Sequence, residues 1–470
     1  MDVREGWTGD AGHPRASIGI GKEVDSRRYV IMITQKHKEL IQHVVKFAQL
    51  NGCAAVRAAI YAGTENSFEY RDTRLEKLQQ ASENSLSVSL FVDGRYGVFS
   101  TNRIEKKEVE KFVKNAIDSI RYLSEDVHRS LPQTDRYYKG GEATDANFDA
   151  TIETLDTDNK ISLAKAAVEE VYNTDPRIIS VSAGYNDSAY FNYLVDSNGF
   201  EGESAQTSFS LSASVSLKDK GDARPESWWY DSALFWEKLQ KSGIGKTALE
   251  RALRKLGQEK IVSGKYTMLV DNMNVGNLLS PVLSAINGNS LAQKDSFLLD
   301  KLGKKVAAER LTLTDEPHLF QAMGSRWFDN EGVATQKRMV IENGILQTFF
   351  IDTYNASKMG VAPTVSGASV LTFKHGDKDL LGLINSLQKG ILVTGFNGGN
   401  SNSSTGDFSF GIEGFLIENG KLTKPVSEMN ITGNLLGLWE RLVAVGNDAR
   451  ESSSWRTPSL MFDGVAFSGL

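Results

Sequence analysis

The side chains best suited to bind a metal ion are few in this sequence. A catalytic zinc usually takes three protein ligands, often two of them histidines one helical turn apart. The closest pair, His37 and His43, is six residues apart, a spacing that turns a helix by about 600° and points the rings to different faces. No His-Glu-x-x-His motif is present, and we expect His318 and His375 to be solvated. The six histidines therefore predict no zinc centre; they are His13, His37, His43, His128, His318 and His375.

Two glycine-rich runs resemble nucleotide sites but are incomplete. The sequence GIGKT at 243–247 resembles the end of a phosphate loop, but that motif needs a glycine where Gln240 stands and a preceding strand where we expect helix. The GIG at 19–21 lacks the third glycine of a dinucleotide fingerprint, because Val24 stands there. No Gly-x-Ser-x-Gly elbow supports a nucleophilic serine, although composition alone leaves a Ser-His-Asp triad open.

The stretch from Gly395 to Pro425 changes character part-way along. It begins rich in glycine, asparagine and serine, and then alternates as Phe-Ser-Phe-Gly-Ile over 408–412, a pattern typical of a half-buried strand. Asn419-Gly420 between two apolar runs predicts a tight hairpin. A backbone with few bulky side chains suits a wall along which a ligand's main chain can lie. A long surface loop is the alternative interpretation.

Composition and charge exclude several classes of protein. The chain has 470 residues, a net charge of −6 and no tract dense in lysine and arginine, so no extended nucleic-acid interface is expected. No apolar run approaches the roughly 18 to 20 residues that cross a bilayer. The single cysteine, Cys53, excludes an internal disulfide and fits a reducing cytoplasm. Residues 1–31 lack the features of a signal peptide and precede a regular helical pattern, so we expect an N-terminal extension there.

The elements that must position any site begin with a small α/β domain, expected over residues 32–123. Residues 124–148 are polar and contain Pro132 and two glycines, which favours a linker. Apolar periodicity in the domain predicts helices at 36–50 and 109–120, a strand at 54–62 and a hairpin over 86–99.

Residues 149–257 are expected to form a middle α+β segment that packs with the first domain. A strand at 209–217 alternates apolar residues with polar ones, mostly serine, which predicts one wet face. We expect the aromatic run 228–230 to be buried between domains; a binding platform is the alternative. Helical spacing is found at 161–172 and 232–256.

Residues 258–470 are expected to form a β-rich domain. Asn-Gly at 343–344 and at 419–420 predicts two hairpins, which we interpret as parts of one large antiparallel sheet system. The fold class is therefore α+β, an N-terminal α/β domain followed by a β-rich C-terminal domain of antiparallel sheets with a few helices. Strands are expected at 261–270, 306–314 and the C-terminal tail, and helices at 274–286 and 435–443.

A set of different short motifs is found, one after another, in the last region. They are Asp329-Asn-Glu-Gly-Val-Ala-Thr335, Tyr354-Asn-Ala-Ser-Lys-Met-Gly360, Ser404-Thr-Gly-Asp-Phe-Ser-Phe-Gly411, Leu416-Ile-Glu-Asn-Gly-Lys421 and Pro425-Val426. In order and spacing they resemble the TldD/PmbA family, and the resemblance extends over residues 32–470. This family is understood to form heterodimeric metalloproteases that trim small unfolded peptides.

The resemblance also implies which kind of subunit this is. TldD-like subunits carry a His-Glu-x-x-x-His zinc motif on the helix after the strand that opens the C-terminal domain, where this chain places Leu278, Leu279 and Leu283. The family's cysteine ligand near the C-terminus is also missing, because residues 451–455 read Glu-Ser-Ser-Ser-Trp. The chain therefore resembles the PmbA-like (TldE) subunit, with no catalytic residue and no metal of its own.

On this resemblance, a TldD-like partner supplies the zinc, and a heterodimer or a homodimer forms around a peptide substrate. Chamber-lining residues are then expected in the glycine-rich run, namely Gly398, Gly399, Thr405, Gly406, Asp407 and Phe408. A regulatory binding protein is the main alternative, in keeping with the family's older label as modulator of DNA gyrase. An autonomous hydrolase with unrecognised nucleophiles is the second.

Overall fold

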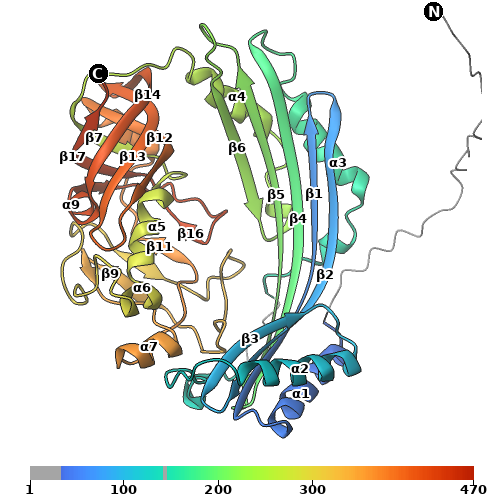
Figure 1. Ribbon diagram of the computed structural model, residues 1–470. Coiled ribbons are helices and arrows are strands. Elements are labelled where there is room, and N and C mark those ends of the chain that lie inside the picture. The colour runs from blue at the N-terminus through green and yellow to red at the C-terminus, as the bar shows by residue number, and fades with distance from the viewer. Residues whose placement is uncertain (1–32, 141–145) are drawn as a thin grey trace, which may run out of the picture.

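A computed structural model describes residues 33–140 and 146–470 of the chain. The expected N-terminal extension at 1–31 and the GIG run at 19–21 lie outside the described residues. Within the described part the chain forms two lobes, a first lobe ending near residue 257 and a second lobe from residue 258 to the C-terminus (Figure 1). The fold is α+β with antiparallel sheets and few helices, as predicted.

The first lobe is built on one antiparallel sheet whose strand order is β3-β2-β1-β4-β5-β6. Its central strands are much longer than the sequence pattern predicted, because residues 64–84 are polar and carry no apolar alternation. Asp93 and Gly94 both have positive φ and close the predicted hairpin between β2 and β3. The bounds are β1 (Ala55–Arg71), β2 (Arg74–Val92), β3 (Arg95–Thr101), β4 (Ile178–Asp196), β5 (Glu201–Leu217) and β6 (Glu226–Ala233).

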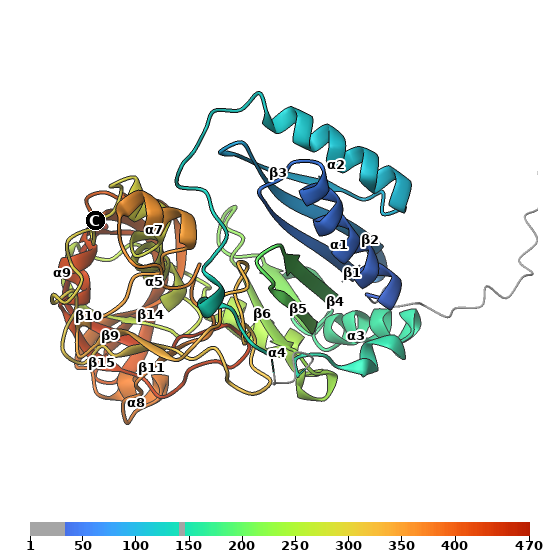
Figure 2. The same ribbon diagram turned by 90° about the horizontal axis from the view of Figure 1, so that it is seen from below.

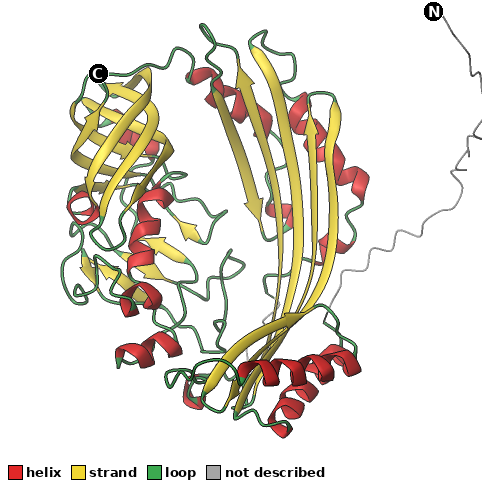
Figure 3. Ribbon diagram, in the orientation of Figure 1, coloured by secondary structure: helices red, strands yellow, loops and turns green. Residues whose placement is uncertain are grey.

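Helices cover one face of this sheet and leave the other for the second lobe. Because side chains alternate along a strand, Val56, Ala58 and Ile60 of β1 all point to the helical face. There α1 (Gln35–Leu50) and α2 (Lys106–Ile120) bury one end, and α3 (Thr157–Glu169) and α4 (Ile244–Arg254) bury the other (Figure 3). The opposite face carries the serines of β5, which confirms the wet face predicted for that strand.

The second lobe contains two sheets. One has the order β14-β13-β12-β7-β17-β15, and a further pairing of β14 with β17 closes it on itself. The other has the order β10-β9-β8-β11-β16. The strands of the first are β7 (Gly264–Val270), β12 (Lys389–Ser401), β13 (Asp407–Glu418), β14 (Lys421–Asn434), β15 (Leu442–Val445) and β17 (Leu460–Ser468). Those of the second are β8 (Leu313–Asp315), β9 (Arg338–Glu342), β10 (Ile345–Leu346), β11 (Leu371–Phe373) and β16 (Trp455–Arg456).

Short helices and 3-10 turns fill the connections. The second lobe carries α5 (Val275–Ala285), α6 (Gly288–Ala292), α7 (Thr353–Met359), α8 (Leu380–Asn385) and α9 (Leu435–Trp439). The 3-10 turns of the first lobe are η1 (Thr134–Arg136), η2 (Ala150–Glu153) and η3 (Trp236–Lys238). None of the described helices is both long enough and apolar enough to span a membrane.

Several local predictions are corrected. Both Asn-Gly hairpins form, but β9–β10 and β13–β14 belong to different sheets, so they are not parts of one sheet system. The helix expected at 232–256 begins only at Ile244, because Gly243 adopts a left-handed φ of 78° and β6 runs to Ala233. The strand expected at 306–314 is limited to Leu313–Asp315, and the helix expected at 435–443 gives way to β15 at Leu442.

The two lobes are joined by the segment after α2, which crosses to the second lobe (Figure 2). Tyr137 forms an isolated antiparallel bridge with Val333, and the Tyr138 backbone N–H donates to the carbonyl of Gly332. The Tyr137 hydroxyl donates to Asp196 at 2.5 Å, beside the buried rings of Phe200 and Phe328. The polar segment expected as a linker therefore contributes to the joint between the lobes.

Candidate functional site

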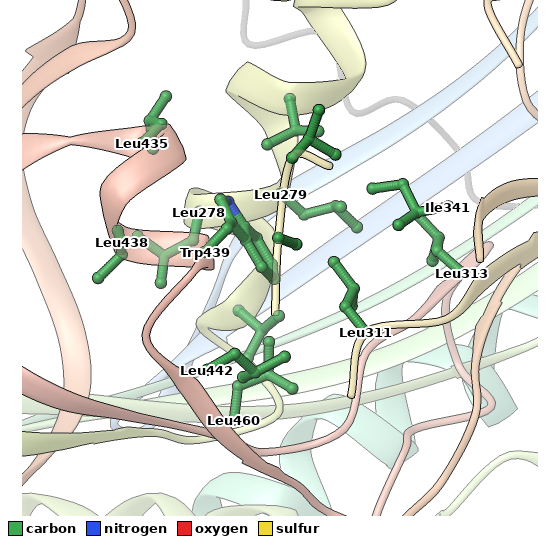
Figure 4. Close-up of a cluster of buried hydrophobic side chains, with 14 of the residues drawn as sticks. Leu278, Leu279, Leu311, Leu313, Ile341, Leu435, Leu438, Trp439, Leu442 and Leu460 are labelled. Atoms are coloured by element: carbon green, nitrogen blue, oxygen red, sulfur yellow. The ribbon is translucent and has the colours of Figure 1, made fainter. Parts of the chain in front are cut away.

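The positions expected for a zinc motif lie in the hydrophobic core of the second lobe. Leu278 and Leu279 on α5 are 0% and 1% exposed, and Leu283 packs against the same core. Figure 4 shows Leu278 and Leu279 pointing toward other hydrocarbon side chains and the ring of Trp439. A metal ion needs lone pairs, and these side chains offer none.

The remaining potential ligands do not gather into a metal site. Among residues 33–140 and 146–470, no group of three or more His, Cys, Asp and Glu side chains is arranged to hold an ion. His43 pairs with Glu110 at 2.8 Å, and His128 contacts the Ser357 hydroxyl at 3.0 Å. Burial raises the pKa of the Cys53 thiol to about 11, which leaves it protonated. The described residues therefore form no three-donor group of the kind that usually holds a catalytic zinc.

The glycine-rich run is a strand and a turn rather than a loop. Gly398 and Gly399 lie within β12, where Gly399 has a φ of 102° and a side chain would collide with the Ser409 carbonyl. At the turn, the Thr405 hydroxyl donates to Asp407 at 2.8 Å. Asn434 also donates to the Asp407 carboxylate, and the Asn434 and Thr405 hydrogen bonds lower the pKa of this carboxyl.

The six expected chamber residues thus come together around one hairpin, but they do not line either of the two large cavities described below. Phe408 is buried and stacks on Phe410, which gives it a place in the core. Gly406 packs against the ring of Phe297. Whether the hairpin borders a chamber formed with a second subunit stays a prediction.

A groove of about 620 Å³ lies between the wet face of the first lobe's sheet and residues 317–330 of the second lobe. Its walls carry several aromatic rings, with Phe320 78% exposed and the tilted rings of Trp327 and His318 at 4.1 Å between centroids. The lining also holds polar side chains of β1, β2, β4 and β5. Apolar walls with a few placed polar groups are typical of a binding site.

Two polar groups in the groove have informative partners. The Thr335 hydroxyl donates to the carbonyl of Arg326, so the ring nitrogen Nε2 of His318, 3.1 Å from that hydroxyl, is the donor in its contact. Asn192 lines the groove on β4, and its Oδ1 atom is buried without a hydrogen-bond partner in the described residues. A buried acceptor of this kind is costly unless a ligand or water donates to it.

The residues of the motif at 329–335 help to hold the two lobes together next to this groove. The buried carboxylate of Asp329 accepts hydrogen bonds from the backbone N–H groups of Glu331, Val333 and Ser366. Gly332 has a φ of 80°, and a Cβ there would lie 2.7 Å from the ring of Phe200 in the first lobe. These residues therefore shape and hold the joint, which accounts for them without a catalytic role.

A second cavity, of about 660 Å³, lies where α4 and β6 of the first lobe face the second lobe. Trp229 of β6 lies between two guanidinium groups, Arg251 at 5.4 Å and Arg450 at 4.7 Å from its ring centroid. The expected burial between lobes fits Trp229, whereas Trp228 is 51% exposed and the expectation was wrong for it. Sequence reasoning missed this cavity, because its arginines and Trp229 belong to three separate segments.

The run that resembled a phosphate loop has a structural explanation. The carboxylate of Glu170 accepts hydrogen bonds from the backbone N–H groups of Gly243 and Lys246, so the chain's own anion occupies the start of α4. A side chain at Gly245 would collide with the carbonyl of Ala167 on α3. Gly245 therefore permits close packing of α3 and α4, and Gly243 provides the left-handed φ of 78° at the start of α4.

The architecture and the groove define a two-lobed α+β protein with a groove of about 620 Å³ between its lobes. Sequence profiles of the PmbA/TldA metallopeptidases match it in three consecutive pieces, domain 1 at 56–120, the central domain at 150–256 and the C-terminal domain at 263–469. The chain belongs to the PmbA/TldD family, whose named members include metalloproteases.

Individual relatives agree with this assignment. A metalloprotease PmbA homologue of Haemophilus influenzae is 28% identical over 93% of this chain and 96% of its own length. The metalloprotease PmbA of Escherichia coli O157:H7 is 28% identical over 87% of this chain and 91% of its own. A crystal structure from Bacteroides thetaiotaomicron, described as a proposed modulator of DNA gyrase, is 59% identical with a TM-score of 0.91, covering 93% of this chain and all of its own.

Proposed function

We propose that this chain is the PmbA-like (TldE) subunit of a cytoplasmic metalloprotease that cleaves small unfolded peptides. In this proposal the chain holds no zinc and shapes the space in which the peptide lies. A TldD-like partner supplies the metal and the general base. The proposal goes beyond family membership, which by itself covers subunits with and without a metal.

One observation carries the proposal: the absence of a three-donor cluster among the described residues of a chain whose relatives are named metalloproteases. This support does not depend on aligning the zinc motif with Leu278 and Leu279, because it concerns every His, Cys, Asp and Glu of the described residues. The hydrocarbon around α5 adds to it, since an unpaired charge placed there would cost several kcal/mol.

The groove supports the peptide-binding part of the proposal. Its aromatic walls can cover apolar side chains of many kinds, and Asn192 Oδ1 can accept a hydrogen bond from a peptide N–H. A protein that binds an extended segment mainly through the segment's main chain discriminates little between sequences. That property suits an enzyme acting on varied unfolded peptides.

The test is reconstitution with a TldD-like subunit from the same genome. The mixture is expected to cleave an unfolded peptide, and the activity is expected to disappear with a chelator and to return with zinc. Each subunit alone is expected to be inactive. Zinc-dependent cleavage by this chain without a partner would overturn the proposal.

A second candidate is a regulatory role toward DNA gyrase, favoured by the description of the Bacteroides relative and of a 26% identical Thermotoga maritima structure with a TM-score of 0.82. Affinity purification separates the two candidates. A TldD-like chain in the eluate supports the protease subunit, and a gyrase subunit in its place supports the regulator.

A further inference from the structure

The second cavity has two walls of opposite character. One wall is apolar and comes from the second lobe, with Leu381 of α8 64% exposed at its surface; its members are Leu380, Leu381, Ile384, Leu392, Phe415 and Leu422. The other wall is cationic and is formed by Arg251 and Arg254 in the last turn of α4. A ligand that fills the cavity must therefore present an apolar group and an anionic group close together.

The acidic groups of this cavity are already engaged. Asp271 accepts hydrogen bonds from the backbone and side chain of Asn274, and Asp379 accepts from the Gly382 backbone at the start of α8. Asp448 accepts from the backbone and hydroxyl of Ser459. A hydrogen bond from a neutral donor does not cancel a carboxylate's charge, but among the described residues only Asp271 of the three forms an ion pair with an arginine of the cavity, Arg251.

The arginines, in contrast, keep side-chain donors that have no acceptor in the described residues. In the described part of the chain, Arg251 makes no hydrogen bond; its Nη2 lies 3.8 Å from Asp271 Oδ2, and its Nε is buried without an acceptor. No hydrogen bond or ion pair to a described residue engages Arg254, although the neighbouring Lys255 is paired with Glu413 at 2.5 Å. Burial lowers the pKa of Arg251, and the nearby carboxylate of Asp271 opposes that shift.

Trp229 helps to position the guanidinium groups of Arg251 and Arg450. Its ring centroid lies 5.4 Å from the Arg251 guanidinium and 4.7 Å from that of Arg450, which also donates to the carbonyl of Tyr230 at 2.8 Å. Stacking of this kind holds a planar guanidinium with its edge free to bind a carboxylate through two parallel hydrogen bonds. The cavity is thus preorganised for an anion before any ligand arrives.

We propose that this cavity binds the C-terminal residue of a peptide, with its α-carboxylate on Arg251 and Arg254 and its side chain against the apolar wall. The last residue of a peptide carries a carboxylate and a side chain on one Cα, which matches the two adjoining walls. A bare phosphate would leave the apolar wall unused. The inference rests on the proposed peptide-binding function and assigns the recognition of free peptide ends to this chain.

The experiment is calorimetric titration of the full chain with N-acetyl-Ala-Ala-Leu, either as the free acid or as the C-terminal amide. The free acid is expected to bind about tenfold more tightly than the amide, the size expected when a charged hydrogen-bond partner is lost. Arg254→Gln is expected to abolish most of that difference. Because Arg254 is exposed, this change leaves the fold intact.

Matched controls identify the site. Lys246→Gln removes one positive charge from an exposed position of the same helix outside the cavity, and is expected to leave binding unchanged. Leu381→Ser is expected to weaken the acid and the amide alike. Equal affinity for acid and amide, or an Arg254→Gln chain that binds the acid as the unaltered chain does, would overturn the inference.

Two further probes separate the sources of a carboxylate or an anion. Decanoate and inorganic phosphate are expected to bind more weakly than the free-acid peptide; tighter binding of either, without competition by the peptide, would contradict the assignment. If the chain shows no preference for a free C-terminus but still supports cleavage with its partner, only this inference is refuted. If the chain prefers a free C-terminus but proves to hold its own zinc, only the subunit proposal is refuted.

Discussion

The groove and the cavity both lie where the two lobes face each other, yet they offer different chemistry. The groove presents aromatic rings and one unpartnered acceptor, Asn192 Oδ1, and suits a peptide's middle. The cavity presents Arg251, weakly paired with Asp271, and Arg254, which has no ion pair with a described residue. Both lie beside a leucine-rich wall, and we propose that this place suits a charged end. If both proposals hold, one interface between lobes binds the main chain of a peptide at one place and its terminus at another.

The largest expected effect comes from the joint that keeps the groove in shape. Asp329→Asn removes a carboxylate that accepts three backbone N–H bonds from two segments, and is expected to lower the free energy of unfolding by about 3 kcal/mol. Urea denaturation measures this loss. Asp300→Asn, the same change at an exposed position, is the control and is expected to stay within about 0.5 kcal/mol. Equal stabilities of the two variants would show that the joint does not depend on Asp329.

The next effect separates groove from cavity directly. Phe320→Ser is expected to weaken binding of a ten-residue amidated peptide several-fold, because an exposed ring that would cover the peptide is lost. Tyr122→Ser, at an aromatic position 91% exposed outside the groove, controls for loss of a surface ring. Arg254→Gln is expected to spare this long amidated ligand. If Arg254→Gln weakened binding of the amidated peptide as much as Phe320→Ser does, the assignment of separate roles to the groove and the cavity would be wrong.

The smallest effect concerns the buried carboxyl at the joint. Burial raises the pKa of Glu331, although the nearby Arg57 opposes the shift. The folded chain therefore holds this proton to higher pH than the unfolded chain. Stability from this group is present at low pH and is lost as pH rises through the raised folded pKa.

Glu331→Gln keeps an acceptor for Thr353 and removes the ionisation. Unfolding free energies measured from pH 4 to 8 are expected to show the unaltered chain losing stability relative to the variant as pH rises. A difference that stays constant across this range would mean that Glu331 titrates alike in both states.

Much of the fold was predictable, because its signals are local. Asn343-Gly344 and Asn419-Gly420 closed hairpins as expected, and β5 showed its wet face through alternating serines. The length of β1 and β2 was not predictable, since residues 74–83 are exposed on both faces and carry no apolar period. A long surface loop was the alternative interpretation of the glycines of β12, because glycine adopts many conformations, whereas Gly399 here permits close approach of β13.

The candidate site was less predictable for a physical reason. The groove and the cavity are each assembled from segments far apart in the chain, and no spacing rule links Trp229 with Arg450 or Asn192 with Phe320. The motif that carried the family resemblance, Asp329 to Thr335, serves the joint between the lobes. Family motifs therefore identified the architecture, and the contacts between lobes identified where a ligand can lie.

The central claim is that this chain contributes no zinc site and works with a subunit that does. The most direct measurement is the zinc content of the purified chain after loading and desalting, alone and after assembly with the TldD-like subunit. We expect no stoichiometric zinc in the chain alone, and about one zinc per TldD-like subunit in the assembly. One zinc per chain in the isolated protein, together with peptide cleavage, would contradict the account.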